Sequence, residues 1–263
     1  LAQKLGMKKI KDITSKFDIG KNIDNNLSMA LGAGEVTLLE LTNAYAMIVN
    51  NGKKIESSLI DTIQNKEGKI IFKHDKRECN NCLIENFENA NLPEIVDNSE
   101  QIIDPITAYQ MVSMLQGVVL RGTGRKINSL NRPLAGKTGT TNNNKDAWFI
   151  GFSPTLVVGV YVGFDKPKSL GNGETGSSVA VPIFKKYMER ILINKPKTPF
   201  RVPSGVSFVK IDPETGLPTT NQNGIIEVFR EGYEPFQRFI LDDKTNIIKD
   251  NNVISGTGGL LLN

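Results

Sequence analysis

Residues 135–141 have the sequence AGKTGTT, residues 146–152 have DAWFIGF, and residues 156–162 have LVVGVYV. Their apolar and β-branched content predicts three short strands, which are residues 134–140, 146–152 and 155–164. Ser153-Pro154 predicts a tight reversal between the last two. Because connections this short can join only antiparallel neighbours, the stretch predicts an antiparallel sheet.

The Lys-Thr-Gly element of the first strand has the chemistry of a carboxylate-binding site. Lys137 supplies a positive charge, and Thr138 and Thr140, two residues apart on one face, supply hydroxyl donors. Gly139 has no side chain, so a ligand backbone can approach the strand edge. The Thr140 amide is then one of two oxyanion-hole donors. The structural alternative makes Lys137 a solvated strand lysine and Gly139 a bulge.

Helices and a hairpin are predicted around this sheet. Apolar residues at three- and four-residue spacing predict a helix over residues 27–52, with a capping box of Thr37 and Glu40. Another helix is predicted to begin at Asp104, its N-cap, followed by Pro105. The remaining predictions are strands over 58–64 and 69–73, a loop over 165–177 and a helix over 182–192. Together they predict an α+β fold, an antiparallel sheet with packed helices.

Composition divides the chain into two regions. Residues 1–194 carry the predicted elements, and within them the polar, Asn-rich residues 74–101 are predicted to form a surface insertion. Residues 195–263 are rich in proline and are predicted to form a linker and an irregular tail, mobile at residues 256–259.

The insertion contains Cys79 and Cys82, five residues after the only histidine, His74. Two thiols and one imidazole are too few for a four-ligand zinc site. The alternatives left open are a local disulfide or free thiols, a metal site and a redox pair. The single histidine also excludes most mechanisms that use a Ser-His or Cys-His pair.

The charge balance is mild, with a net charge of +4 and a pI near 8.9. It gives no case for nucleic acid as a partner, since arginine-rich stretches interleaved with aromatic residues are absent from the sequence. No apolar run approaches the ~18 residues of a membrane span. Leu1 is not a natural start, so the chain is expected to be cut from a longer one.

Several short motifs follow one another along residues 1–190. They are LSMALG at 27–32, EVTLLE at 35–40, AYA at 44–46, NG at 51–52, RGTG at 121–124 and AGKTGTT at 135–141, followed by the strand of Trp148. In this order they resemble the transpeptidase domain of class A penicillin-binding proteins, of the bifunctional 1A type. The resemblance implies part of the penicillin-binding protein/serine β-lactamase-like fold, with the N-terminal portion missing.

The resemblance also implies which motif does what. In that family Ser-x-x-Lys supplies the acylated serine and its lysine base, Ser-x-Asn supports proton transfer, and Lys-Thr-Gly binds the peptide carboxylate. The implied substrate-binding residues are Lys137, Thr138, Gly139 and Thr140, with the Thr140 amide in the oxyanion hole. No metal site is implied.

The first two family motifs are expected before Gly32, and neither is present there. Residues 207–210 fit Ser-x-x-Lys, but they follow Lys-Thr-Gly and lie in a strand-like stretch. Residues 129–131 fit Ser-x-Asn, but they lie just before the Lys137 strand. Neither match is expected to be catalytic, so the chain by itself is predicted to be inactive.

The resemblance implies a fragment of a serine-type peptidoglycan D,D-transpeptidase from a bifunctional glycosyltransferase/transpeptidase parent. Its implied partners are peptidoglycan stem peptides, other cell-wall synthesis proteins and, only with the missing N-terminal portion, β-lactams. No cofactor is implied. The parent is expected on the periplasmic face of the bacterial inner membrane, anchored by a transmembrane helix outside this chain.

Three other interpretations stay open. The first is a non-catalytic module of the same fold that binds peptidoglycan or a partner. The second is a D,D-carboxypeptidase or serine β-lactamase relative, in which water resolves the acyl-enzyme. The third is an unrelated β-rich structural fragment with a chance Lys-Thr-Gly.

Overall fold

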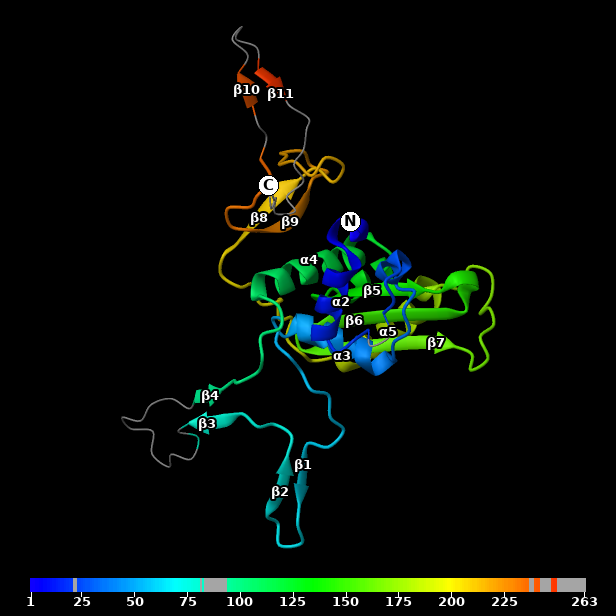
Figure 1. Cartoon of the computed structure of the whole chain (residues 1–263), viewed down its shortest axis with the longest axis vertical. Coiled ribbons are helices and arrows are strands. Elements are labelled where there is room, and N and C mark those ends of the chain that lie inside the picture. The colour runs from blue at the N-terminus through cyan, green and yellow to red at the C-terminus, as the bar shows by residue number, and fades with distance from the viewer. Residues whose placement is uncertain (21–22, 81, 83–93, 237–238, 242–246, 250–263) are drawn as a thin grey trace. The chain divides into compact units, whose positions relative to one another are not determined.

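The computed structural model describes residues 1–20, 23–80, 82, 94–236, 239–241 and 247–249 (Figure 1). The chain forms two compact units, unit 1 from residues 1–35 and 53–102, and unit 2 from residues 36–52 and the chain after 102. The end of the predicted tail, residues 256–259, lies outside the described residues.

Unit 1 consists of short elements. They are α1 (Ala2–Leu5), α2 (Met7–Lys16), η1 (Leu27–Leu31), β1 (Thr62–Gln64), β2 (Ile70–Lys73), β3 (Glu78–Asn80) and β4 (Glu94–Val96). Strands β1 and β2 form an antiparallel hairpin, as do β3 and β4 (Figure 1). The β1–β2 turn is stabilised by the Asn65 side chain, which accepts hydrogen bonds from the N–H groups of Glu67 and Lys69. The hairpin predicted around residues 65–68 is therefore confirmed.

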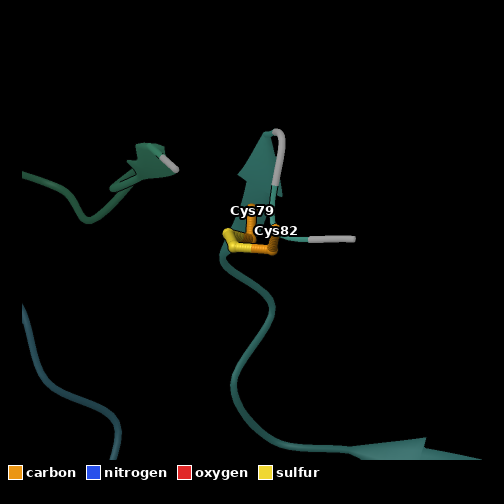
Figure 2. Close-up of a disulfide and its surroundings, with 2 residues drawn as sticks. All are labelled: Cys79 and Cys82. Atoms are coloured by element: carbon orange, nitrogen blue, oxygen red, sulfur yellow. A yellow bond between two sulfur atoms is a disulfide. The ribbon is translucent and has the colours of Figure 1, made fainter. Parts of the chain in front are cut away.

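Cys79 and Cys82 form a disulfide, with their Cα atoms 5.7 Å apart (Figure 2). Of the alternatives that the sequence left open, the local disulfide is the one observed. Most described side chains of residues 74–101 are exposed. Residues 81 and 83–93 of the predicted insertion lie outside the described part of the chain.

The helix predicted over residues 27–52 is wrong in its continuity. A 3₁₀ turn, η1, ends at Gly32, whose φ of 90° is left-handed and readily adopted only by glycine. Helix α3 (Leu38–Val49) begins afresh at Thr37. The Thr37 hydroxyl accepts from the Glu40 N–H, and the Glu40 carboxylate accepts from the Thr37 N–H, so the predicted capping box is confirmed.

The centre of unit 2 is an antiparallel sheet in the order β5-β6-β7 (Figure 1). Its strands are β5 (Ala135–Thr140), β6 (Asp146–Ser153) and β7 (Leu156–Gly163), close to their predicted limits. The other elements of unit 2 are α4 (Pro105–Arg121), η2 (Arg125–Leu130), η3 (Asn142–Asn144), the π-helical turn η4 (Gly176–Ala180), α5 (Val181–Ile191), β8 (Val206–Ile211), β9 (Ile225–Arg230), β10 (Phe239–Leu241) and β11 (Ile247–Lys249).

The two faces of this sheet pack into different apolar clusters. On one face, Phe149 packs edge-on against Phe184 of α5, in a cluster that includes Ile127 of η2 and Ala180 of η4. We call this the α5 face. On the other face, Ala135 and Phe152 pack with residues of α4 and α3. We call this the α4 face. The alternation of β5 therefore assigns each of its side chains to one face or the other.

Regular structure also occurs within the segment predicted as a linker and irregular tail. Strands β8 and β9 pair antiparallel, from Val206 opposite Arg230 to Ile211 opposite Ile225. The hairpin packs on α4, since Tyr109 of α4 contacts Phe208 edge-on at 6.3 Å between ring centroids. The alternation near residue 207 is strand-like in the sequence, but the prolines on either side conceal the second strand.

Candidate carboxylate-binding site on strand β5

The hydroxyls of Thr138 and Thr140 lie on the α5 face of the sheet. Thr138 is paired with Phe149, whose ring packs on α5, and Thr140 is two residues farther along the same strand. Lys137 and Gly139 are paired with Ile150 and Trp148 and therefore belong to the α4 face. The prediction that the two threonines share one face is confirmed. The side chain of Lys137 belongs to the opposite face.

The amides of β5 at the same two positions are not used in the pairing with β6. The N–H of Thr141 donates to the carbonyl of Asp146 across the strand pair, at 3.2 Å. Since hydrogen-bonded and non-hydrogen-bonded pairs alternate in an antiparallel ladder, the N–H and C=O groups of Thr138 and Thr140 point away from β6. Among the described strands, β5 is at the edge of its sheet. These backbone groups therefore face the side of β5 where a ligand could pair with it.

Thr140 receives a hydrogen bond from the turn that precedes α5. Its Oγ1 accepts from the N–H of Gly176, at 3.0 Å. Gly176 is buried directly over the β5–β6 backbone, since a Cβ at this position would lie 2.4 Å from the Trp148 carbonyl oxygen and 2.6 Å from that of Gly139. The loop predicted over residues 165–177 thus ends on the candidate site.

Thr138 is linked to the turn that follows α4. Its Oγ1 lies 2.7 Å from the Oγ1 of Thr123. The Ser177 hydroxyl donates to the Thr123 carbonyl at 2.7 Å, and the Lys126 Nζ donates to the Ser177 carbonyl at 3.3 Å. Three segments that are distant in sequence therefore meet beside the two threonines of β5.

No role is predicted from the sequence for Thr123, Gly176 or Ser177. The RGTG motif at 121–124 was noted only as a family marker, and residues 176–177 were included in a loop. Their contacts join residues between 15 and 54 positions apart, with Thr123 to Thr138 the shortest link and Thr123 to Ser177 the longest. Such links carry no local sequence signal.

Lys137 is exposed, and its Nζ donates to the carbonyl of Thr138 at 2.8 Å. Beyond it on the α4 face, Trp148 and Tyr161 are in contact, with ring centroids 4.7 Å apart. The Tyr161 hydroxyl donates to Asp146, and this hydrogen bond raises the pKa of Tyr161. Asp146 also accepts from the Thr141 hydroxyl at 3.0 Å, so it braces the end of the β5–β6 pair.

The Ser-x-x-Lys and Ser-x-Asn matches outside the site have side-chain contacts that differ from those of a catalytic motif. Ser207 and Lys210 both lie on strand β8, where residues three apart point to opposite faces, so the lysine cannot serve as a base for that serine. Ser207 instead donates to Glu234. Ser129, in η2, donates to the carbonyl of Lys126 one turn earlier. Neither serine is hydrogen-bonded to the other polar residue of its motif.

The described residues contain neither a metal-binding cluster nor a helix that could span a membrane. No set of three or more His, Cys, Asp or Glu side chains within the described ranges is arranged to hold a metal ion. In the same part of the chain, no helix has both the length and the apolar character needed to cross a bilayer.

The antiparallel sheet, its helices and the Lys-Thr-Gly strand define a class of protein. The model of the penicillin binding protein transpeptidase domain family matches residues 1–189, and the chain belongs to this family. Its mixed helix and sheet architecture is the fold of that family, of which it contains a part.

Within the family, the chain is similar to proteins named penicillin-binding protein 1A. It is 39% identical to that of Rickettsia bellii (strain RML369-C) over 254 residues, which are 96% of this chain and 32% of the relative. The crystal structure of penicillin-binding protein 1A from Haemophilus influenzae matches with a TM-score of 0.75 and 29% identity, over 91% of this chain and 38% of that one. The chain therefore spans about a third of the length of these relatives.

A more distant structure shares the fold. PonA1 of Mycobacterium tuberculosis, solved in complex with penicillin V, matches with a TM-score of 0.58 and 21% identity, over 74% of this chain and 52% of that one.

Proposed function

We propose that this chain is the carboxylate-binding part of a serine-type peptidoglycan D,D-transpeptidase. Family membership supports the reaction class. One observation carries the assignment of the site. The hydroxyls of Thr138 and Thr140 share one face of an edge strand, and their amides point away from β6 at the edge of the sheet. Hydroxyl and amide donors at the same two residues suit a ligand that presents a carboxylate next to a peptide carbonyl.

In this proposal a serine outside the chain attacks the penultimate D-Ala carbonyl of a stem peptide and forms an acyl-enzyme, and the terminal D-Ala leaves. An amine from a neighbouring peptidoglycan chain then attacks the ester, which makes the cross-link and frees the serine. Thr138 and Thr140 bind the terminal carboxylate, while the Thr140 amide stabilises the oxyanion. Gly139 leaves room for the substrate backbone.

Lys137 has a different part in this site from the one that its sequence position suggests. Its side chain belongs to the α4 face, opposite the two hydroxyls, and is exposed. We infer that it contributes positive charge at the strand edge rather than sharing the hydroxyls' side of the ligand. Charge of this kind favours an anionic ligand without requiring direct contact.

β-Lactams are the second ligand class that we propose, because a relative of the same fold is solved with penicillin V. We also propose that the whole protein is a bifunctional glycosyltransferase/transpeptidase anchored in the inner membrane, with this part in the periplasm. The disulfide between Cys79 and Cys82 supports an oxidising compartment. Other cell-wall synthesis proteins are its proposed partners, and its chemistry needs no cofactor.

The proposal is tested by penicillin labelling of the full-length protein. Thr138→Val with Thr140→Val removes both hydroxyls and keeps β-branched side chains in the strand. We expect labelling by a fluorescent penicillin to slow by roughly one to two orders of magnitude, as lost hydrogen bonds to a charged group imply. Thr62→Val, an exposed strand threonine of unit 1, is the control and should label at the wild-type rate. Equal rates in all three proteins would contradict the proposed site.

The non-catalytic binding module remains the second candidate. The two candidates differ in the protein outside this chain, since both are consistent with a Ser-x-x-Lys match that lies on strand β8 with its two side chains on opposite faces. A full-length protein that binds penicillin reversibly but forms no covalent adduct would support the binding module and contradict the transpeptidase.

A further inference from the structure

We propose that Thr123 is a positioning residue that orients the hydroxyl proton of Thr138 toward the ligand carboxylate, and that the Gly176 N–H does the same for Thr140. The inference rests on the proposed function of β5 and extends it to two segments outside the strand. Thr123 follows α4 and Gly176 precedes α5, and each contacts a different threonine of the site.

The hydroxyl groups of Thr138 and Thr140 have a limited capacity for hydrogen bonds. A threonine hydroxyl has one proton to donate and can accept up to two hydrogen bonds. The Gly176 N–H can only donate, so Thr140 is the acceptor in that contact, at 3.0 Å. The proton of Thr140 is thereby kept free, and the backbone of η4 determines the direction from which its oxygen is approached.

The contact between Thr123 and Thr138 has two polarities, because either oxygen can be the donor at 2.7 Å. If Thr138 donated to Thr123, its only proton would be unavailable to a ligand. If Thr123 donates, the proton of Thr138 is free, and both threonines of β5 act alike. A bound carboxylate selects the second polarity, because a hydrogen bond to a charged acceptor is about twice as strong as one between neutral groups. A chain of two donors in series also strengthens each bond.

Thr123 is held in place from outside the strand. Ser177 donates to the Thr123 carbonyl at 2.7 Å, and Lys126 donates to the Ser177 carbonyl at 3.3 Å. Ser177 is the neighbour of Gly176 in η4, so a single turn fixes both partners of the β5 threonines. The buried position of Gly176 keeps this turn against the sheet.

The test compares two ligands that differ in whether their carboxyl group is charged or methylated. Benzylpenicillin has a free carboxylate, and its methyl ester does not. In the full-length protein, Thr123→Val should lower the second-order acylation rate with benzylpenicillin by roughly tenfold, the size of one hydrogen bond between protein groups. With the methyl ester the rate should change by less than about twofold, since a neutral acceptor gains little from an oriented proton. Thr123→Ser keeps the hydroxyl and should restore the rate with benzylpenicillin.

A double-mutant comparison links the effect to Thr138. In a Thr138→Val background, Thr123→Val should have no further effect on benzylpenicillin, because the proton that it orients is gone. Additive losses would mean that Thr123 acts independently of Thr138, which would overturn the inference.

Two further outcomes would also overturn it. Equal losses with both ligands would mean that Thr123 only supports the fold. A faster reaction of Thr123→Val with benzylpenicillin would mean that Thr138 donates to Thr123 and that the polarity is reversed.

The result also separates this inference from the proposed function. If Thr138→Val reacts with benzylpenicillin at the wild-type rate, the carboxylate site itself is wrong. Suppose instead that Thr138→Val slows acylation by benzylpenicillin but not by its methyl ester, while Thr123→Val shows no such difference between the two ligands. The carboxylate site then stands, and only the positioning role of Thr123 fails.

Discussion

At the scale of single residues, a glycine limits what the candidate site can tolerate. The backbone oxygens of Trp148 and Gly139 lie within 2.6 Å of the place where a Cβ of Gly176 would be. These are backbone atoms, so a larger residue at 176 must displace η4 or the strand pair rather than a flexible side chain. The same movement would lengthen the hydrogen bond from Gly176 to Thr140.

We therefore predict that Gly176→Ala destabilises the chain by about 1–3 kcal/mol, the usual cost of overpacking. Urea unfolding followed by the fluorescence of Trp148, the only tryptophan, measures this change beside the site itself. Gly34→Ala is the matched control, because the nearest heavy atom to its added Cβ is 3.5 Å away, and it should cost less than about 0.5 kcal/mol. Equal midpoints for the two variants would show that η4 yields freely.

At the scale of elements, the β8–β9 hairpin is fastened to both ends of α4. Arg230 pairs with Asp104, the N-cap of the helix, at 2.6 Å, and Arg121 in its last turn pairs with Glu227. Between them, the Gln110 side chain donates to the Val228 carbonyl at 3.2 Å. Since α4 leads directly into the turn of Thr123, the hairpin supports an element on which the site depends.

The pairing of Arg230 with Asp104 predicts a pH dependence. Partial burial alone would raise the pKa of Asp104, but hydrogen bonds from Thr107 and Arg230 outweigh it and lower that pKa below its ordinary value of 3.8. A carboxylate with a lowered pKa contributes stability above the unfolded value, and this contribution is lost as the pH falls below 3.8 through the folded-state pKa.

We expect Arg230→Gln to lower Tm by roughly 1–3 °C at neutral pH, as a largely exposed ion pair allows. The difference from wild type should shrink as the pH falls from 3.8 through the lowered folded-state pKa of Asp104, because Asp104 becomes protonated over this range. Thermal melts from pH 7 to pH 3 measure it. Lys66→Gln, whose side chain is 91% exposed, is the control and should match wild type throughout. A difference that does not shrink at all between pH 7 and pH 3 would mean that the arginine stabilises by packing alone.

At the scale of the whole molecule, the chain spans about a third of the length of the curated relatives that it matches. We predict that residues 1–263 by themselves form no covalent adduct with benzylpenicillin, because the Ser-x-x-Lys match of the sequence lies on a strand. Intact-mass spectrometry after incubation tests this, with the full-length protein as the positive control. A mass increase equal to one penicillin on the isolated chain would contradict it and would locate a nucleophile in this segment.

Periodicity and turn chemistry allowed the sequence to determine the class of fold and most of its central elements. The β-branched runs predict β5 to β7, the capping box predicts the start of α3, and Asp104-Pro105 predicts the start of α4. These signals are local, involving residues up to four apart, so they survive without knowledge of the partners. The same locality explains why one continuous helix is predicted over residues 27–52. The apolar spacing continues across Gly32, although the chain leaves the helical conformation there.

The tertiary structure alone decided which groups surround the Lys-Thr-Gly strand. Strand alternation could group Thr138 with Thr140, but that the hydroxyls face α5 and Lys137 faces α4 depends on how each helix packs on the sheet. Likewise, the partners of the two hydroxyls come from turns 15 and 36 residues away in sequence. Hydrogen bonds over such separations leave no periodic signal in the sequence, because folding, rather than chain connectivity, brings their atoms together.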